Sequence, residues 1–137
     1  MAKQIWINLP VRDIERSKKF FVALGFSFDS EHGNSETSAS LIIGEKNVVV
    51  MLFAEKVFRS FTGHDIIDPS KGSEVLLSLD AGSKQEVDEF LQKVKGAGGT
   101  IFGEPDDKGW MYGFGFADLD GHRWNMLYMD ISRMPGR

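Results

Sequence analysis

The sequence predicts an α+β fold made of two tandem β-α-β-β-β modules. Two observations predict it. Each half of the 137-residue chain has a strand-like segment, then an amphipathic helix, then three more strand-like segments. The last strands of the halves also resemble each other, Val50–Glu55 in the first and Asn125–Asp130 in the second. A module of this size is too small to cover its own sheet, so we expect the two sheets to share one core.

The first module is expected over residues 4–53. Gln4–Val11 alternates in the way of a half-buried strand. Asp13 is a typical helix N-cap, and the helix is predicted to run to Leu24 and to end at Gly25. Glycine-containing turns then separate the remaining strand-like segments. These are Phe26–Ser30, Thr37–Ile43 and Asn47–Phe53.

The second module is expected over residues 73–130 and repeats this order. Glu74–Leu79 is a predicted strand. Ser83 and Glu86 have the spacing of a capping box, which predicts the start of a helix. Apolar residues recur at helical spacing along it, at Val87, Phe90, Leu91 and Val94. Glycines between 96 and 99 are expected to end the helix, and the later strands are Thr100–Phe102, Trp110–Phe116 and Arg123–Met129.

Residues 54–72 are expected to connect the modules, and residues 1–137 to form a single domain. This connection is long, and long connections usually have a functional or a packing role. Its apolar residues are Val57, Phe58, Phe61, Ile66 and Ile67. We therefore expect it to form a lid or an interface.

The composition excludes several classes of function. The 16 Lys and Arg residues against 20 Asp and Glu give a net charge of −4, which argues against a nucleic-acid partner. Cysteine is absent, which excludes disulfides and thiol nucleophiles. No apolar run approaches the ~18 residues that a membrane span needs, and the N-terminus lacks a signal-peptide pattern. We expect a cytoplasmic protein, without a membrane partner, that binds or acts on a small molecule.

Three motifs resemble those of the vicinal oxygen chelate superfamily, which includes glyoxalase I, extradiol dioxygenases, and fosfomycin- and bleomycin-resistance proteins. They are the strand-to-helix opening Asn8–Phe21, the helix end Ala23–Phe26 and the turn Asp118–His122, in which Leu119 replaces the family's proline. The resemblance spans residues 4–130, and the sequence resembles a bacterial glyoxalase-like branch of the superfamily. It implies curved mixed sheets around a cup and a homodimeric assembly. It does not fix the function, because one fold hosts many chemistries.

The resemblance also implies where a metal would lie. Enzymes of this superfamily hold one divalent metal with His and Glu side chains, and the resemblance places the first and last ligand positions at Trp6 and Asn125. The internal repeat maps Trp6 onto Glu74 and Asn125 onto Val50, which gives the other two positions. Glu74 is a strong ligand, whereas Asn125 offers a neutral amide oxygen. Catalytic metal sites usually take three protein ligands from His, Cys and carboxylate side chains. We therefore expect no cofactor, or at most a divalent metal held weakly by Glu74 and Asn125.

The residues expected to line the cup include a strand with two glycines. In Trp110–Ala117 aromatic residues alternate with small ones, and the resemblance turns the small ones into the cup and the aromatic ones toward a helix. Glycine in a strand marks either a close approach by another group or strong strand curvature, and both explanations stay open. The candidate ligand-binding residues are Trp6, Asn8, Val50, Leu52, Glu74, Leu76, Ser78, Met111, Gly113, Gly115, Asn125 and His64.

The three histidines have different expected roles. His32 and His122 lie in predicted turns, where a structural or surface role is expected. His64 lies in the connection beside its apolar residues. It would contact a ligand or act as a base over the cup, or else be an exposed loop histidine.

Three functions are compatible with these residues. The leading one is a metal-independent protein that binds a small organic molecule in its cup. The second is a metal-dependent glyoxalase I-like lyase or extradiol-type dioxygenase, and the third is a non-enzymatic scaffold whose cup is filled by Trp6. Glu74 is the candidate catalytic residue, because a carboxylate in such a cup would act as a base. The alternative is that Glu74 forms a structural ion pair with Arg123 or with a lysine. Whether the protein is an enzyme stays open.

Overall fold

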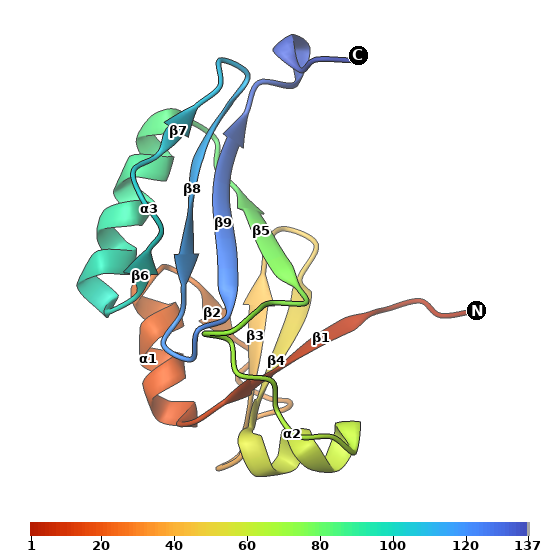
Figure 1. Ribbon diagram of the computed structural model, residues 1–137. Coiled ribbons are helices and arrows are strands. Elements are labelled where there is room, and N and C mark those ends of the chain that lie inside the picture. The colour runs from red at the N-terminus through yellow and green to blue at the C-terminus, as the bar shows by residue number, and fades with distance from the viewer. Residues whose placement is uncertain (137) are drawn as a thin grey trace. The chain divides into compact units, whose positions relative to one another are not determined.

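The computed structural model describes residues 1–136 and divides into two compact units. Unit 1 is Met1–Asp68, and unit 2 begins at Pro69. The boundary lies within the segment expected to connect the modules. Each unit contains a mixed sheet and a helix that packs on it (Figure 1). The α+β fold of two repeated modules with mixed sheets is therefore confirmed, while a core shared between the units stays a prediction.

Unit 1 contains four strands and two helices. They are β1 (Trp6–Val11), α1 (Ile14–Ala23), β2 (Ser27–Phe28), β3 (Ser38–Ile43), β4 (Val48–Ala54) and α2 (Glu55–Thr62). The sheet order is β1-β4-β3-β2. β1 runs parallel to β4, and the other neighbours are antiparallel. The parallel pair needs a crossover, and α1 lies on it and packs against β2, β3 and β4.

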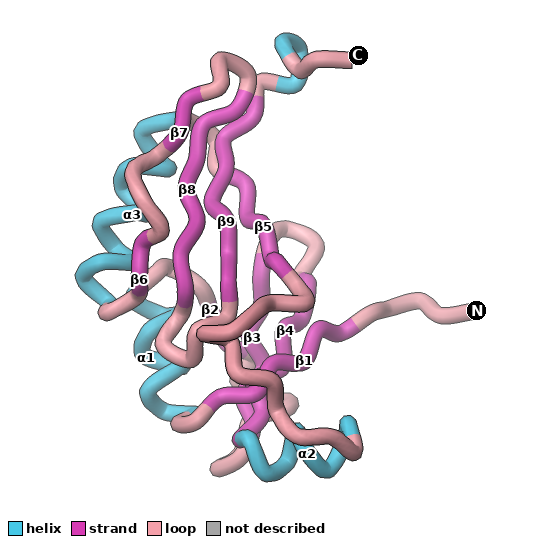
Figure 2. The backbone as a smooth tube through the Cα atoms, viewed as in Figure 1, coloured by secondary structure: helices cyan, strands magenta, loops and turns pink. Residues whose placement is uncertain are grey.

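Unit 2 repeats this topology and adds the short strand β7 beside β8 (Figure 2). Its elements are β5 (Leu76–Asp80), α3 (Lys84–Ala97), β6 (Thr100–Ile101), β7 (Asp106–Asp107), β8 (Met111–Ala117), β9 (Arg123–Met129) and the 3-10 helix η1 (Ile131–Arg133). The sheet order is β5-β9-β8-β6, with β5 parallel to β9, and β7 pairs with β8. None of the helices in residues 1–136 is long and apolar enough to cross a membrane.

Both long helices begin at the predicted caps. The Asp13 carboxylate accepts the backbone N–H of Arg16 at 3.1 Å. The Ser83 hydroxyl accepts the N–H of Glu86 at 3.1 Å, and the Glu86 carboxylate accepts the N–H of Gly82 at 2.7 Å. These bonds satisfy donors that a helix N-terminus leaves unpaired, which explains why both helices start where the sequence predicts.

The core of unit 2 is an aromatic layer between α3 and the sheet. Phe90 of α3 lies with its ring centroid 5.7 Å from that of Phe116, and Phe116 stacks on Trp124 at 6.3 Å. Phe116 and Trp124 are 0% and 1% exposed. The expectation that the aromatic side of this strand faces a helix is confirmed.

The segment that connects the modules differs from its expected form. It begins with the eight-residue helix α2, which packs against β1 and β4. The rings of Phe53 and Phe61 meet edge to face at 5.1 Å. The helical spacing of Val57, Phe58 and Phe61 was the available signal for this helix. β5 also begins at Leu76, two residues later than expected, and the two-residue strand β7 was not predicted.

Candidate functional site

The register of the two sheets gives a residue-by-residue equivalence between the units. In unit 1, Met51 of β4 lies between its neighbours on β1 and β3. In unit 2, Asn125 of β9 lies between its neighbours on β5 and β8. The two rows are Asn8–Met51–Ser40 and Ser78–Asn125–Gly115. Met51 is therefore the unit 1 counterpart of Asn125.

This register corrects the expected position of two residues. Paired residues in a sheet point to the same side, and successive residues alternate. Because Trp6 pairs with Val49, the neighbouring Val50 points to the side opposite Trp6, and Leu52 follows it. Val50 and Leu52 are 2% and 0% exposed. The expectation that they share a face with Trp6 and Asn8 is wrong, because the repeat was aligned one residue out of register at β4.

The expected equivalence of Trp6 and Glu74 is also wrong. Trp6 stands seven residues before the helix cap Asp13, and Leu76 stands seven residues before the cap Ser83. Leu76 is therefore the counterpart of Trp6, and Glu74 lies exposed before β5. Within residues 1–136, no ion pair joins Glu74 to Arg123 or to a lysine, so the structural pairing considered for Glu74 is not formed.

We call the side of the unit 2 sheet opposite α3 the open face. Its polar side chains include Ser78, Asp80, Arg123 and Asn125, and Leu76 and Met129 are exposed on the same face at 57% and 38%. The remaining residues that alternation places on it include Met111, Gly113, Gly115 and Leu127. The second-module residues expected on one face, apart from Glu74, are thus confirmed to share it.

A cation, an amide and a hydroxyl occupy neighbouring positions on the open face. The guanidinium carbon of Arg123 lies 3.8 Å from the centroid of the Phe102 ring. The Asn125 amide nitrogen donates to the Ser78 hydroxyl at 3.4 Å. Phe102 was not among the candidates, because its position depends on the backbone bond from its N–H to the Gly115 carbonyl, at 3.0 Å. Such long-range pairing leaves no local pattern in the sequence.

The two glycines of β8 accommodate close contacts within the protein. A Cβ on Gly115 would lie 3.0 Å from Phe102 Cδ2 and 3.4 Å from the Asn125 amide oxygen. A Cβ on Gly113 would overlap the Met126 carbonyl oxygen and lie 2.6 Å from Leu127 Cδ2. Of the two explanations considered for these glycines, the structure favours close approach, and the approaching groups belong to the chain itself.

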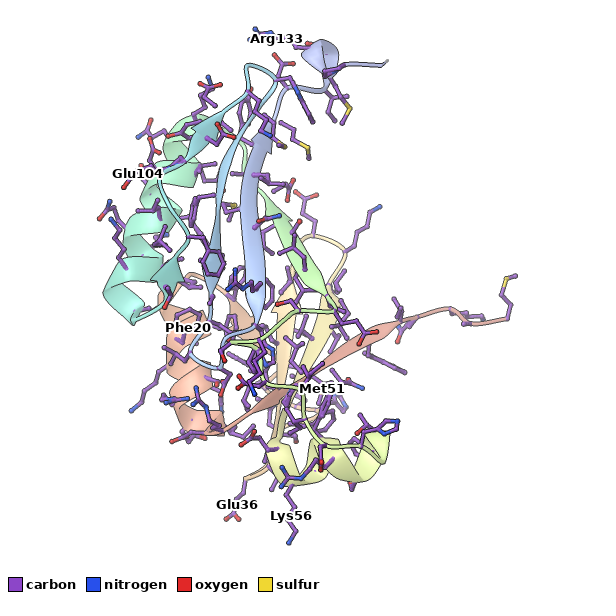
Figure 3. The ribbon with its side chains drawn as sticks, viewed as in Figure 1. Phe20, Glu36, Met51, Lys56, Glu104 and Arg133 are labelled. Carbon is purple, nitrogen blue, oxygen red and sulfur yellow. The ribbon has the colours of Figure 1, made fainter. Side chains whose placement is uncertain are left out.

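In unit 1 a loop covers the counterpart of Asn125. A Cβ on Gly33 would lie 3.1 Å from Ser40 Cβ and 3.2 Å from Met51 Cε, so the loop packs against both residues (Met51 is labelled in Figure 3). The Ser38 hydroxyl donates to the Gly33 carbonyl at 2.8 Å, and the Asn34 side-chain oxygen accepts the Ser40 N–H at 3.2 Å. Ser40 is therefore buried and Met51 half-buried, while Asn8 at the end of the row stays exposed.

Asp29 shapes the start of this loop. Its carboxylate accepts the backbone N–H groups of Glu31 and His32 at 2.9 and 3.2 Å. These bonds, foremost the one from Glu31, lower the pKa of Asp29 from its usual value. The side chain of His32 also lies beside it, with Nδ1 3.6 Å from the carboxylate. His32 thus has the turn position expected for it.

The other two histidines occupy different settings. His64 is exposed just after α2, and its backbone N–H donates to the Thr62 hydroxyl at 3.2 Å. The His122 N–H donates to the buried carboxylate of Asp118 at 3.0 Å, in the turn between β8 and β9. Asp118 also accepts the indole N–H of Trp124, and burial raises its pKa. This carboxylate is a structural part of the turn, as the sequence predicts.

The donor atoms available do not fit the family's divalent metal. At the implied positions, Trp6 has no donor, Val50 and its replacement Met51 offer at best a soft thioether, and Asn125 offers a neutral amide. Hard and borderline divalent metals prefer carboxylate and imidazole ligands. Residues 1–136 contain no group of three or more His, Asp or Glu side chains placed to hold a metal ion. Leu76, which takes the position expected for Glu74, has no metal-binding atom either, and Glu74 lies exposed before β5.

Comparison with known proteins agrees with the motifs. The sequence model of the Glyoxalase/Bleomycin resistance protein/Dioxygenase superfamily matches residues 3–126. A hypothetical protein from S. aureus, SA1046, is 34% identical, with a TM-score of 0.83 over 93% of this chain and 95% of that one. Among curated proteins, none matches this chain.

Two further solved structures share the fold at lower identity. One is a family enzyme from Burkholderia phytofirmans, 18% identical, with a TM-score of 0.76 over 90% of this chain and 96% of that one. The other is the bleomycin resistance determinant encoded on transposon Tn5, 22% identical, with a TM-score of 0.62 over 94% and 99%. The match to the superfamily covers most of the sequence, and this chain therefore belongs to the glyoxalase/bleomycin resistance protein/dioxygenase superfamily.

Proposed function

We propose that this protein binds a small organic molecule against the open face of unit 2, without a tightly held catalytic metal. The observation that carries this proposal is the change of side chains at the implied ligand positions. We infer that Trp6, Met51, Leu76 and Asn125 occupy the ligand positions of the superfamily's enzymes, and that Glu74, exposed before β5, stands outside them. The sheet that holds the metal site in the superfamily's enzymes is still present in this chain and would bind a small molecule without the metal.

The open face has the composition of a small-molecule site. Ligand sites combine apolar area with a few polar groups that fix orientation. Here Leu76, Phe102 and Met129 are each more than a third exposed; Phe102 lies against the guanidinium of Arg123, Leu76 is the strand partner of Arg123, and Met129 lies at the far end of β9 on the same face. Exposed apolar side chains grouped around polar ones mark a recognition surface more often than isolated ones do.

Metal content tests the first part of the proposal. Purified protein is incubated with Ni²⁺, Zn²⁺, Fe²⁺ or Mn²⁺, dialysed, and analysed for bound metal per chain. We expect well below one ion per chain, because one carboxylate and one amide cannot retain the ion. One equivalent of metal that survives dialysis, and that the Glu74→Gln variant loses, would contradict the proposal.

Thermal unfolding tests the second part. A panel of aromatic and antibiotic compounds is screened for an increase in Tm, since a ligand at a hundred times its Kd stabilises the folded state by about 2.7 kcal/mol. We expect at least one compound to raise Tm, and Asn125→Ala to reduce that increase. Gln92→Ala, on an exposed position of α3, is the matched control and keeps the full increase. A panel without any stabilising compound favours the scaffold alternative.

We also propose a homodimer in the cytoplasm. Ile5 and Trp6, at the start of the edge strand β1, are 79% and 58% exposed. Large apolar side chains at a sheet edge favour pairing with another chain. Light scattering after size-exclusion chromatography measures the assembly, with Ile5→Lys expected to shift it toward the monomer. A wild-type protein that is monomeric at every concentration would contradict this.

A further inference from the structure

Arg123 is the cation of the open face, and its geometry leaves it ready to bind an anion. Its guanidinium lies flat enough over Phe102 for the carbon to approach the ring centroid to 3.8 Å. A stacked guanidinium uses its face for the ring and keeps its in-plane N–H groups for other partners. Such an edge matches a carboxylate or a phosphonate with two parallel hydrogen bonds.

Glu74 and Asp80, the carboxylates on either side of Leu76, which is the β5 partner of Arg123, do not occupy this edge. Glu74 is exposed and forms no ion pair with Arg123 among the described residues. Asp80 pairs with Leu127, whereas Arg123 pairs with Leu76 at the opposite end of β5. Four residues of strand separate the two rows, about 13 Å at the usual rise. An exposed charge at that distance is largely screened.

We propose that the molecule bound on the open face is an organic anion, and that Arg123 binds its carboxylate or phosphonate group. This inference rests on the proposed function and narrows its ligand class. The Asn125 amide and the Ser78 hydroxyl lie one row further along the same face, where they bond polar atoms of the ligand body. Leu76 and Met129 supply apolar surface at either end of this region.

Phe102 is a positioning residue for Arg123. The ring occupies space that Gly115 leaves vacant, since a Cβ there would lie 3.0 Å from Phe102 Cδ2. The backbone bond from Phe102 to Gly115 fixes where the ring begins. The ring therefore holds the guanidinium over β8 in an orientation that a fully solvated arginine would seldom adopt, because ordering such a side chain costs conformational entropy.

The test uses four small probes that differ in charge. ¹⁵N NMR titrations measure binding of benzoate, phenylphosphonate, neutral benzamide and cationic benzamidine to the full chain. We expect the two anions to shift signals of Arg123, Asn125 and Ser78, and the other two to bind at least about tenfold more weakly. Arg123→Gln loses at least about tenfold in benzoate affinity. Arg59→Gln, on the exposed surface of α2, is the matched control and changes nothing.

Each result decides the inference separately from the proposed function. Benzamide or benzamidine binding on the open face as tightly as benzoate overturns the anion preference and leaves small-molecule binding standing. Unchanged benzoate affinity in Arg123→Gln does the same. If none of the four probes binds, the inference fails, and the wider Tm panel decides the proposed function independently.

A second pair of variants tests the role of Phe102. Phe102→Leu removes the ring and is expected to weaken benzoate binding about threefold, the size of an exposed cation–π contact. Phe102→Tyr keeps the ring and retains wild-type affinity. The Tm of both variants is measured, to check that each stays folded. A loss of benzoate affinity that both variants share, or no loss in Phe102→Leu, overturns the positioning role.

Discussion

The two units have an equivalent row of three positions in their sheets, but the side chains in the two rows have different surroundings. In unit 2, Ser78–Asn125–Gly115 lies on the open face beside Arg123 and Phe102. In unit 1, Met51 and Ser40 of the row Asn8–Met51–Ser40 lie under the loop that contains Gly33, whereas Asn8 is exposed. A repeated fold therefore preserves backbone positions while the chemistry above them diverges.

One position explains much of the divergence. Asp29 donates its N–H to the Ser40 carbonyl at 2.9 Å, and its counterpart Phe102 donates to the Gly115 carbonyl at 3.0 Å. The Asp29 carboxylate accepts two following N–H groups, which bends the chain into the loop that covers unit 1. At Phe102 the side chain itself lies on the sheet and supports Arg123. A polar residue starts a loop that covers Met51, whereas an aromatic one packs on the sheet and supports an arginine.

The largest expected effect on stability is the difference between alanine substitutions at Gly113 and at its unit 1 counterpart, Ser38. Gly113→Ala places a Cβ against the Met126 carbonyl oxygen, and backbone cannot move aside as a flexible side chain can. We expect a loss of about 3 kcal/mol in the free energy of unfolding, measured with urea. Ser38→Ala, the matched change in unit 1, removes one hydroxyl and costs about 1 kcal/mol. Equal losses at the two positions would show that the units are packed alike.

The next largest effect on stability concerns Asp118, a carboxyl group that unit 2 has in its turn and unit 1 lacks. Asp118 is buried at the turn after β8, where unit 1 has Ile43. Asp118→Asn replaces one of the two carboxylate oxygens that accept backbone and indole N–H groups. We expect a loss of about 2 kcal/mol at neutral pH.

The same variant carries a pH signature. Burial raises the pKa of Asp118 above its usual 3.8, so the folded protein keeps a proton that the unfolded chain releases. This group therefore costs stability as pH rises from about 3.8 through its raised pKa. The free energy of unfolding is measured against pH for both proteins, and subtracting the Asp118→Asn values from the wild-type values isolates the contribution of Asp118. A difference that grows more favourable to the wild type over that window would contradict the assignment.

A smaller effect measures how tightly the loop covers Met51. Gly33 and Gly44 both have φ of 77°, but a Cβ on Gly44 meets nothing within 4 Å, whereas one on Gly33 meets Ser40 and Met51. Alanine at either position costs about 1 kcal/mol from the backbone alone. We expect Gly33→Ala to cost about 1 kcal/mol more. Equal Tm values for the two variants would mean that the loop lies loosely on Met51.

The smallest effect compares the helix caps. Ser83→Ala and Asp13→Ala each remove one accepted N–H bond and are expected to cost about 1 kcal/mol. Glu86→Ala, which releases the Gly82 N–H, is expected to cost about half as much. Urea unfolding ranks the three variants. A Glu86→Ala loss above that of Ser83→Ala would reverse the assigned order of the two bonds.

The sequence predicts those parts of the fold that depend on local patterns. The caps Asp13 and Ser83, the stripe along α3 and the alternation of β8 are all short-range signals, and the structure confirms them. The superfamily match over residues 3–126 and the similarity to SA1046 over 93% of the chain agree with the fold predicted from these patterns.

The site was predicted less completely, because it depends on register. Alternation placed Asn125, Ser78 and Gly115 on one face correctly. It failed for Val50, because aligning the repeat through turns of unequal length shifted β4 by one residue. It also missed Phe102, whose contact with Arg123 joins positions 21 residues apart. No local pattern reports such a pairing.

The parallel strand pairs have a consequence for how the chain folds. Trp6 pairs with Val49, and Leu76 pairs with Arg123, so the first strand of each unit has no partner until the last strand is available. The hairpins β3–β4 and β8–β9 join neighbours in sequence and close far smaller loops. During synthesis on the ribosome, each hairpin should therefore form before its edge strand docks, and the edge strand should be the first to exchange its amide hydrogens.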